Sequence, residues 1–155
     1  MKLCQTVSFG FRPLTEGDAG FLDRLSVKNE KNRPMLGTGF EENKKLANAF
    51  AKNREIYPLA SVITKGKKDV GIIILTDAGK KAIDVSLMLL NEEESVHYGT
   101  IYEEVLKETI SECRLNGIGK IFFAPTEKFD FGCKFADATV TKIGTDEFQE
   151  FQFVL

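Results

Sequence analysis

The sequence predicts one α/β domain (α+β type), residues 1–155, with a mixed, mostly antiparallel sheet and helices on both faces. Two observations lead to this fold class. Three apolar segments between residues 56 and 90 are joined by short polar turns, which is typical of an antiparallel meander. A long amphipathic segment then separates the strand at Ala82–Leu90 from a short apolar strand at Lys120–Ala124. Because a strand, a crossover helix and a strand form a right-handed parallel unit, we expect these two strands to be adjacent and parallel.

Composition limits the classes of function. The chain has 155 residues, of which 43% are hydrophobic and 28% charged, as is ordinary for one soluble globular domain. The formal net charge of -2 argues against a nucleic-acid partner, and no apolar run approaches the roughly 20 residues of a membrane span. The single histidine, His97, excludes a multi-histidine metal site. The cysteines lack metal-ligand spacing, so we expect no metal, reduced thiols and a cytoplasmic location; they are Cys4, Cys113 and Cys133.

The N-terminal third predicts one strand and two helices. Apolar residues alternate along Thr6–Leu14, which is typical of a strand, and Pro13 ends it. Thr15 and Asp18 have capping-box spacing and mark the start of a helix. The apolar residues of that helix are Phe21, Leu22 and Leu25. After a polar loop, Phe40–Asn53 predicts a second helix with a thin apolar face, formed by Leu46, Ala49 and Phe50.

The meander follows. We expect strands at Ile56–Thr64, at Val70–Leu75 and from Ala82 to Leu90, with turns at residues 65–69 and at Thr76–Lys80. The third strand carries apolar residues on both faces near its end, so both of its faces are expected to be covered. These residues are Val85, Leu87 and Leu89 on one face, and Met88 and Leu90 on the other.

The long helix has a helical repeat of apolar residues, consisting of Ile101, Val105, Thr109 and Cys113 with Tyr102, Leu106 and Ile110 alongside. Thr100 and Glu103 have capping-box spacing, and Asn116 followed by Gly117 supplies a stop. The N–H groups and the positive dipole end at the start of such a helix favour an anion. The same residues also fit an ordinary strand-to-helix turn.

The C-terminal segment predicts two further strands, at Ala138–Ile143 and Phe148–Leu155. In the second, Phe151 and Phe153 alternate with polar residues in a half-buried pattern. An aromatic-rich strand at the end of the chain is suited to a dimer seam or to a partner's sheet, and it favours a homodimer.

The strand, the loop ending in Tyr98-Gly99-Thr100 and the long helix resemble the acyl-CoA-binding core of the GNAT family of N-acetyltransferases. The family loop reads Q/R-x-x-G-x-G/A in one-letter code. In this chain its first position is Glu94, its first glycine is His97 and its second is Gly99, so only Gly99 matches. The order of elements follows the family along nearly the whole chain.

The resemblance implies a GNAT-like domain that transfers an acetyl group from acetyl-CoA to a small-molecule or peptide amine. It also implies that the strands at Ala82–Leu90 and Lys120–Ala124 splay apart to admit the pantetheine arm. The residues expected to bind the cofactor are Leu89, Leu90, Val96, His97, Tyr98, Gly99 and Thr100.

The catalytic residues are left open. The candidate acids and bases are Asp84, Glu92, Glu93, Glu94, His97 and Cys133, and none is assigned. No tyrosine lies beyond Tyr102, where the family often places the acid that protonates the leaving thiolate. A catalytically inactive GNAT-like binding or regulatory module is therefore an alternative, and a small domain unrelated to CoA is a third.

Overall fold

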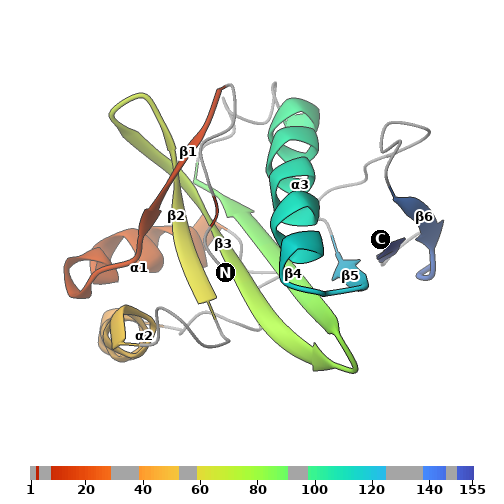
Figure 1. Ribbon diagram of the computed structural model, residues 1–155. Helices are drawn as coiled ribbons and strands as arrows, with labels where there is room; N and C mark the ends of the chain where they lie inside the picture. The colour runs from red at the N-terminus through yellow and green to blue at the C-terminus, as the bar shows by residue number, and fades with distance from the viewer. Residues whose placement is uncertain are drawn as a thin grey trace.

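The computed structural model describes residue 3 and residues 8–28, 39–52, 59–90, 98–124, 138–145 and 150–155. These residues form one seven-stranded sheet with the strand order β1-β2-β3-β4-β5-β7-β6 (Figure 1). The strands are β1 (Gly10–Pro13), β2 (Leu59–Lys65), β3 (Lys68–Gly79), β4 (Ala82–Leu89), β5 (Lys120–Phe123), β6 (Thr139–Lys142) and β7 (Phe151–Val154). The helices are α1 (Ala19–Lys28), preceded by a 3-10 turn at Glu16–Asp18, α2 (Phe40–Lys52) and α3 (Tyr98–Leu115). All strand pairs are antiparallel except β4 with β5, so the predicted mixed, mostly antiparallel sheet is confirmed.

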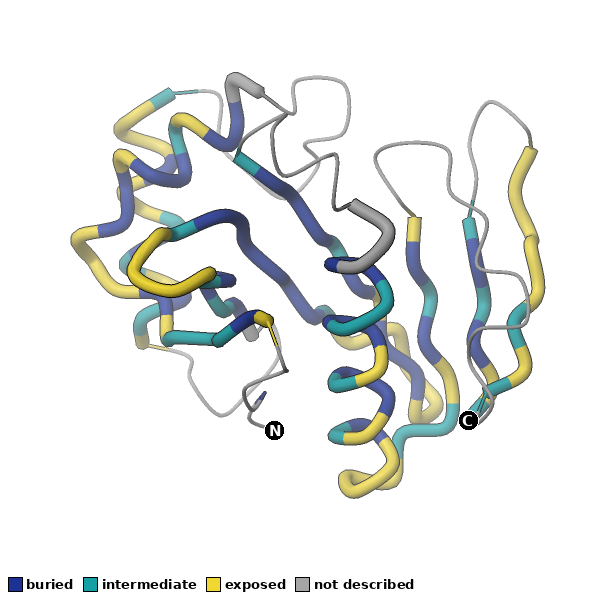
Figure 2. Tube along the Cα trace, turned by 90° about the horizontal axis from the view of Figure 1, so that it is seen from above, coloured by how far each residue is buried: buried dark blue, intermediate teal, exposed yellow. Residues whose placement is uncertain are grey.

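The core has two layers because successive residues of a strand point to opposite faces. Ile73, Val85 and Leu87 pack with α3 on one face, and Ile72, Ile74 and Met88 pack with α1 and α2 on the other. The central strands are buried along most of their length, as Figure 2 shows. The prediction of a last meander strand covered on both faces is therefore confirmed, as is that of helices on both faces of the sheet.

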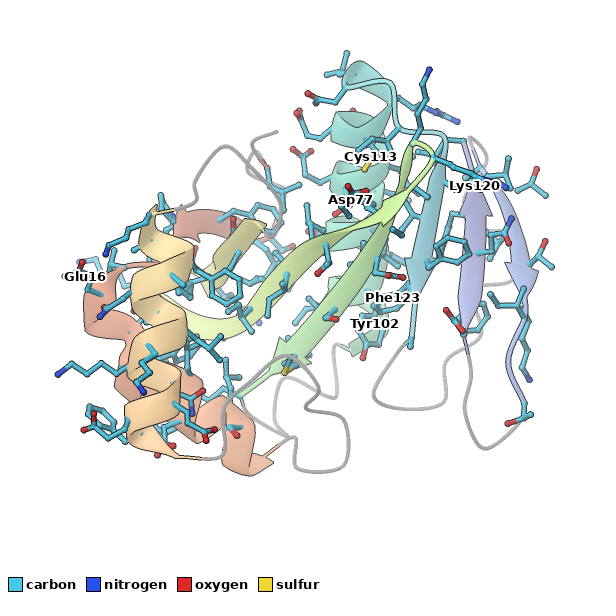
Figure 3. The ribbon with its side chains drawn as sticks, turned by 90° about the horizontal axis from the view of Figure 1, so that it is seen from below. Glu16, Asp77, Tyr102, Cys113, Lys120 and Phe123 are labelled. Carbon is cyan, nitrogen blue, oxygen red and sulfur yellow. The ribbon has the colours of Figure 1, made fainter. Side chains whose placement is uncertain are left out.

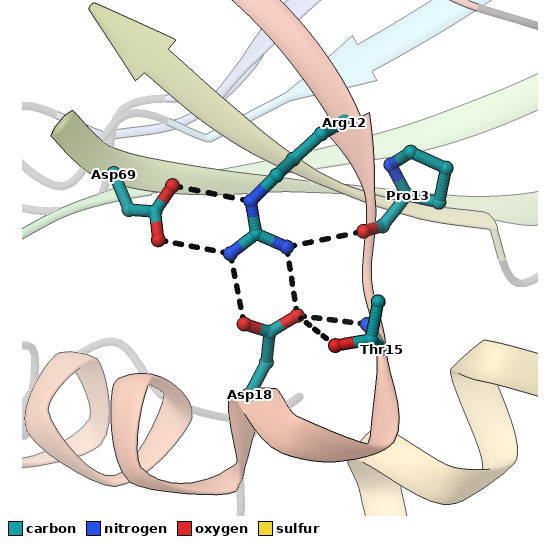
Figure 4. A network of polar contacts seen from close by, with 5 residues as sticks. All are labelled: Arg12, Pro13, Thr15, Asp18 and Asp69. Atoms are coloured by element: carbon teal, nitrogen blue, oxygen red, sulfur yellow. Dashed lines mark hydrogen bonds and ion pairs between the residues drawn. The ribbon is translucent and has the colours of Figure 1, made fainter. Parts of the chain in front are cut away.

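Arg12 links β1 to the start of α1 and to β3 (Figure 4). Its guanidinium donates to both carboxylate oxygens of Asp18, at 2.8 and 2.9 Å, and to both of Asp69, at 2.9 and 3.1 Å. Asp18 also accepts a 2.7 Å hydrogen bond from the backbone N–H of Thr15, which confirms the predicted capping box. Burial alone would raise the pKa of Asp18, but the hydrogen bonds from Arg12 and Thr15 outweigh burial and lower it.

The buried face of the second helix is partly the predicted one, because Phe50 is buried and Leu46 packs, partly buried, against the same core. Ala49 is exposed, whereas Ala47 and Phe50 are buried, and Asn43 completes the same face one turn earlier. The buried Asn43 donates a 3.3 Å hydrogen bond to Asp23 of α1. The buried face of α2 thus includes a polar residue, Asn43, which a search for apolar periodicity does not find.

The two turns of the meander are shorter than predicted. The first is confined to Gly66 and Lys67, and β3 runs on through residues 76–79, which were predicted as turn. The second turn is Lys80-Lys81, where both residues have positive φ (48° and 59°). A two-residue turn with positive φ at both positions matches the twist of paired strands, and a bulge between Asp77 and Gly79 leads into it.

The strand–helix–strand unit is as predicted. β4 and β5 are adjacent and parallel, and all seven predicted apolar positions of α3 are buried. Gly117 ends the helix with a φ of +71°. The prediction of a cap at Thr100 is wrong, because α3 begins two residues earlier at Tyr98 and Thr100 lies in its first turn.

The aromatic strand is not an edge. β7 lies between β5 and β6 and pairs with both along Phe151–Val154, while Phe151 and Phe153 are buried in the chain's own core. The reason given for a homodimer through this strand is therefore wrong. No helix within the described residues is long and apolar enough to cross a membrane.

Candidate functional site

The described pairing of β4 with β5 ends halfway along β4. β3 pairs with β4 as far as Gly71 opposite Leu89, whereas the last pair between β4 and β5 is Val85 opposite Phe123. Within the described residues, the second half of β4 therefore pairs with β3 alone. The N–H of Leu90 donates to the carbonyl of Val70 at 2.8 Å, which places the backbone groups of even-numbered β4 residues toward β3. The backbone groups of the odd-numbered residue Leu87 thus point to the opposite side of β4, the side on which β5 pairs with its first half.

The start of α3 follows the parted strand. Gly99 and Thr100 lie in the first turn of the helix, whose first N–H groups have no partner within an α-helix. The helix dipole adds a positive partial charge there. Leu89 is buried on the α3 face and Leu90 is half-buried on the other face. Of the predicted cofactor residues, the structure therefore describes Leu89 and Leu90 together with the helical backbone of Tyr98–Thr100; Val96 and His97 lie outside the described residues.

An aromatic pair closes the α3 side of the parting point. The ring of Tyr102, in the second turn of α3, meets the ring of Phe123, the last residue of β5, edge to face with centroids 5.3 Å apart (Figure 3). Both side chains are fully buried. An edge-to-face pair adds about 0.5–1.5 kcal/mol beyond burial of its area. The pair therefore holds the end of β5 against α3 at the level where the described pairing of β4 with β5 ends.

Gly71 allows β3 to lie close to the far end of β4. A Cβ atom at this position would meet the carbonyl oxygen of Met88, and it would lie 2.8 Å from Cδ2 of Leu89. No other residue fits there unless β4 shifts. This close contact is the physical reason for a glycine at position 71.

Asp84 and Ser86 lie on the face of β4 opposite α3, next to the parting point. Asp84 is exposed, and partial burial raises the pKa of its carboxyl group. Within the described residues, the carboxylate of Asp84 has neither a hydrogen bond nor an ion pair. The structure thus keeps Asp84 as a candidate for binding or proton transfer.

Cys113 does not add a reactive group to this region, and the other candidates from the sequence are not described. Burial, and then the nearby charge of Glu112, raise the pKa of Cys113 to about 12, so this thiol is not a reactive group. Among the described residues, no three metal-ligating side chains come together. The remaining candidates lie outside the described residues; they are Glu92, Glu93, Glu94, His97 and Cys133.

No protein-family model matches the sequence, and no curated protein matches it. Solved structures do match. An acetyltransferase of the GNAT family from Bacillus anthracis is 9% identical with a TM-score of 0.71, and the match covers 99% of this chain and 98% of that one. RimL, a ribosomal L7/L12 alpha-N-protein acetyltransferase in complex with coenzyme A, is 15% identical with a TM-score of 0.69 over 99% and 97% of the two chains.

A third match is the microcin C7 self-immunity acetyltransferase MccE in complex with acetyl-CoA and AMP. It is 12% identical with a TM-score of 0.66, over 96% of this chain and 93% of that one. These similarities extend over nearly the whole of each chain, although sequence identity is low. The chain therefore has the fold of the GNAT acetyltransferases.

Proposed function

We propose that the protein is an N-acetyltransferase that transfers an acetyl group from acetyl-CoA to a small-molecule or peptide amine. The observation that carries this proposal is that the described β4–β5 pairing ends at Val85 and Phe123 while β4 runs on to Leu89, with α3 as the next described element of the chain. Two of the matching acetyltransferases are in complex with CoA or acetyl-CoA, which supports the same cofactor here.

The described residues fit the two ends of such a cofactor differently. The N–H groups of Tyr98, Gly99 and Thr100 suit the pyrophosphate, because the start of a helix attracts anions through its N–H groups and its dipole. The backbone groups of Leu87 suit an amide of the pantetheine arm, because they point to the side of β4 where the described pairing with β5 has ended. Both interactions use backbone groups and need no particular side chain. Val96 and His97, which lie between Leu89 and Tyr98 in the sequence, are also proposed to bind the cofactor.

The proposed reaction is direct attack on the thioester. The amine nitrogen forms a bond to the carbonyl carbon of the acetyl group, the carbon–sulfur bond breaks, and the sulfur leaves as the thiolate of CoA. The amine must lose a proton and the thiolate must gain one. A pantetheine arm bound along the second half of β4 would bring its thioester to the level of the sheet, where an acceptor could reach it from either face.

A thermal melt with and without millimolar acetyl-CoA tests the cofactor site. A ligand that binds only the folded state adds about 2.7 kcal/mol at roughly 100 times its dissociation constant. For a chain of this length the melting temperature then rises by several degrees, at about 2–4 °C per kcal/mol. An unchanged melting temperature would contradict the proposal.

A pair of glycine variants locates the binding. Gly99→Glu puts a carboxylate in the first turn of α3, where it repels a pyrophosphate, so the shift should disappear. The matched control is Gly20→Glu, which makes the same change at the second residue of α1, where a Cβ meets nothing within 4 Å. The control should keep the full shift. Equal shifts in both variants would argue against the first turn of α3 as the binding site.

A further inference from the structure

Half of the sheet face that carries α1 and α2 is not covered by these helices. Their core takes residues from β2, β3 and β4 but none of the described residues of β5, β7 and β6. The strand registers align one row across five strands of this open face. We name it the amine strip, and its members are Thr76, Asp84, Phe122, Gln152 and Thr141.

The amine strip has an open, polar surface with one aromatic residue. Asp84 and Thr141 are exposed, and the other three members are half-buried. With strands about 4.8 Å apart, five residues span roughly 19 Å. The strip crosses β4 one residue before the last pair of β4 with β5, Val85 with Phe123. It therefore runs beside the opening proposed for the cofactor.

The chemistry of the strip favours a cation. When ionised, the carboxylate of Asp84 accepts hydrogen bonds but donates none. Phe122 is the residue directly opposite Asp84 on the neighbouring strand β5. A carboxylate beside an aromatic face attracts an ammonium group through charge and through the ring quadrupole. Lys120 lies on the same face two residues along β5, but no ion pair joins it to Asp84. The negative charge of Asp84 thus has no described cationic partner.

We propose that the amine strip binds the acceptor, and that Asp84 and Phe122 together hold an ammonium group of that acceptor. Thr76 and Gln152 supply hydrogen-bonding groups on either side of this pair. The acceptor class is a primary amine with an apolar group next to it, because the ring of Phe122 offers apolar contact beside the carboxylate. This inference rests on the proposed function, since it specifies how the amine reaches the thioester.

The test uses phenethylamine as a probe and its neutral analogue 2-phenylethanol as a control, each titrated into isotope-labelled protein and followed through backbone amide shifts. We expect phenethylamine to shift the amides of Thr76, Asp84, Phe122 and Gln152, with the alcohol at least roughly tenfold weaker, since charge-assisted hydrogen bonds are the stronger kind. Shifts that map elsewhere would overturn the proposal. So would equal binding of the alcohol, or no binding of phenethylamine at tens of millimolar.

Two variants isolate the carboxylate. Asp84→Asn should weaken phenethylamine at least roughly tenfold, as loss of a charged hydrogen-bond partner does. The control is Asp77→Asn, which removes an exposed carboxylate of β3 and keeps an oxygen for the N–H of Gly79. Asp77→Asn should bind like the wild type; if Asp84→Asn does so too, the proposal is wrong.

The acetyl-CoA melt separates this inference from the proposed function. Asp84→Asn should keep the acetyl-CoA shift, because the site proposed for the cofactor consists of backbone groups of other residues. Amine binding by a wild type without an acetyl-CoA shift would reject the acetyltransferase and keep an amine-binding surface. An acetyl-CoA shift with unchanged amine binding in Asp84→Asn would reject only the amine strip.

Discussion

Replacement of Gly71 by alanine tests the close approach of β3 to the far half of β4. A Cβ at Gly71 meets the backbone carbonyl of Met88 and lies 2.8 Å from Cδ2 of Leu89, so the backbone of β4 must shift to admit it. Overpacking of this kind costs about 1–3 kcal/mol. At about 2–4 °C per kcal/mol, the melting temperature should fall by between roughly 2 and 12 °C. The assay is a thermal or urea melt of the purified variant.

The same substitution at Gly20 serves as the control, because its expected effect has the opposite sign. Gly20 lies in α1, its φ is not in the left-handed region, and a Cβ there meets nothing within 4 Å. Alanine should therefore raise stability by about 0.5–1 kcal/mol. Gly71→Ala should also weaken the acetyl-CoA shift, since Leu89 lies opposite Gly71. A Gly71→Ala protein as stable as the wild type would refute the argument.

Three further predictions follow from the ionisable groups. Asp18→Asn should lower the melting temperature at pH 7, and the difference from the wild type should shrink as the pH is lowered. The pKa of Asp18 is lowered in the folded state, so its stabilising effect is complete above the ordinary pKa of 3.8 and is lost as pH falls through the folded-state pKa. A deficit that is constant down to pH 2 would contradict this. Asp84→Asn should leave the melting temperature at pH 7 unchanged or slightly raised. The pKa of Asp84 is raised in the folded state, so its contribution to stability is present below the unfolded-state pKa and is lost as pH rises through the folded-state pKa. A clear loss of stability in the variant would show a structural role for Asp84. Cys113 should resist iodoacetamide at pH 8 in the native state and react after unfolding, as peptide mapping would detect, since its pKa is raised to about 12; rapid native modification would contradict its burial.

The periodic elements could be predicted from the sequence because their signals are local and strong. The apolar repeat from Ile101 to Cys113 and the apolar run from Val85 to Leu90 specify a helix and a buried strand. The crossover rule then placed β4 beside β5. The structure confirms both elements and their parallel pairing.

The errors occur where several local patterns fit equally well. In α2, alanines at 47, 49 and 51 allow more than one apolar face, and the buried face contains Ala47 together with Asn43, which donates to Asp23 of α1. Thr100 and Glu103 have capping-box spacing inside a helix that starts earlier. Spacing alone does not distinguish an N-cap from a residue of the first turn.

Much of the candidate site depends on contacts between distant parts of the chain. The amine strip requires the registers of five strands, and the Tyr102–Phe123 pair joins residues of a helix and a strand. The position of β7 between β5 and β6 likewise follows from long-range pairing, so its role as an inner strand was missed. Sequence periodicity reports which face of an element is apolar but not which element lies next to it.

Acetyl-CoA is proposed to bind along the second half of β4 and at the first turn of α3. An amide-shift titration of the isotope-labelled protein with acetyl-CoA tests it most directly. The largest shifts should fall on Leu87–Leu90, on Tyr98–Ile101 and at the end of β5, with little change in α1. No shifts at millimolar acetyl-CoA, or shifts centred on α1 and α2, would contradict it.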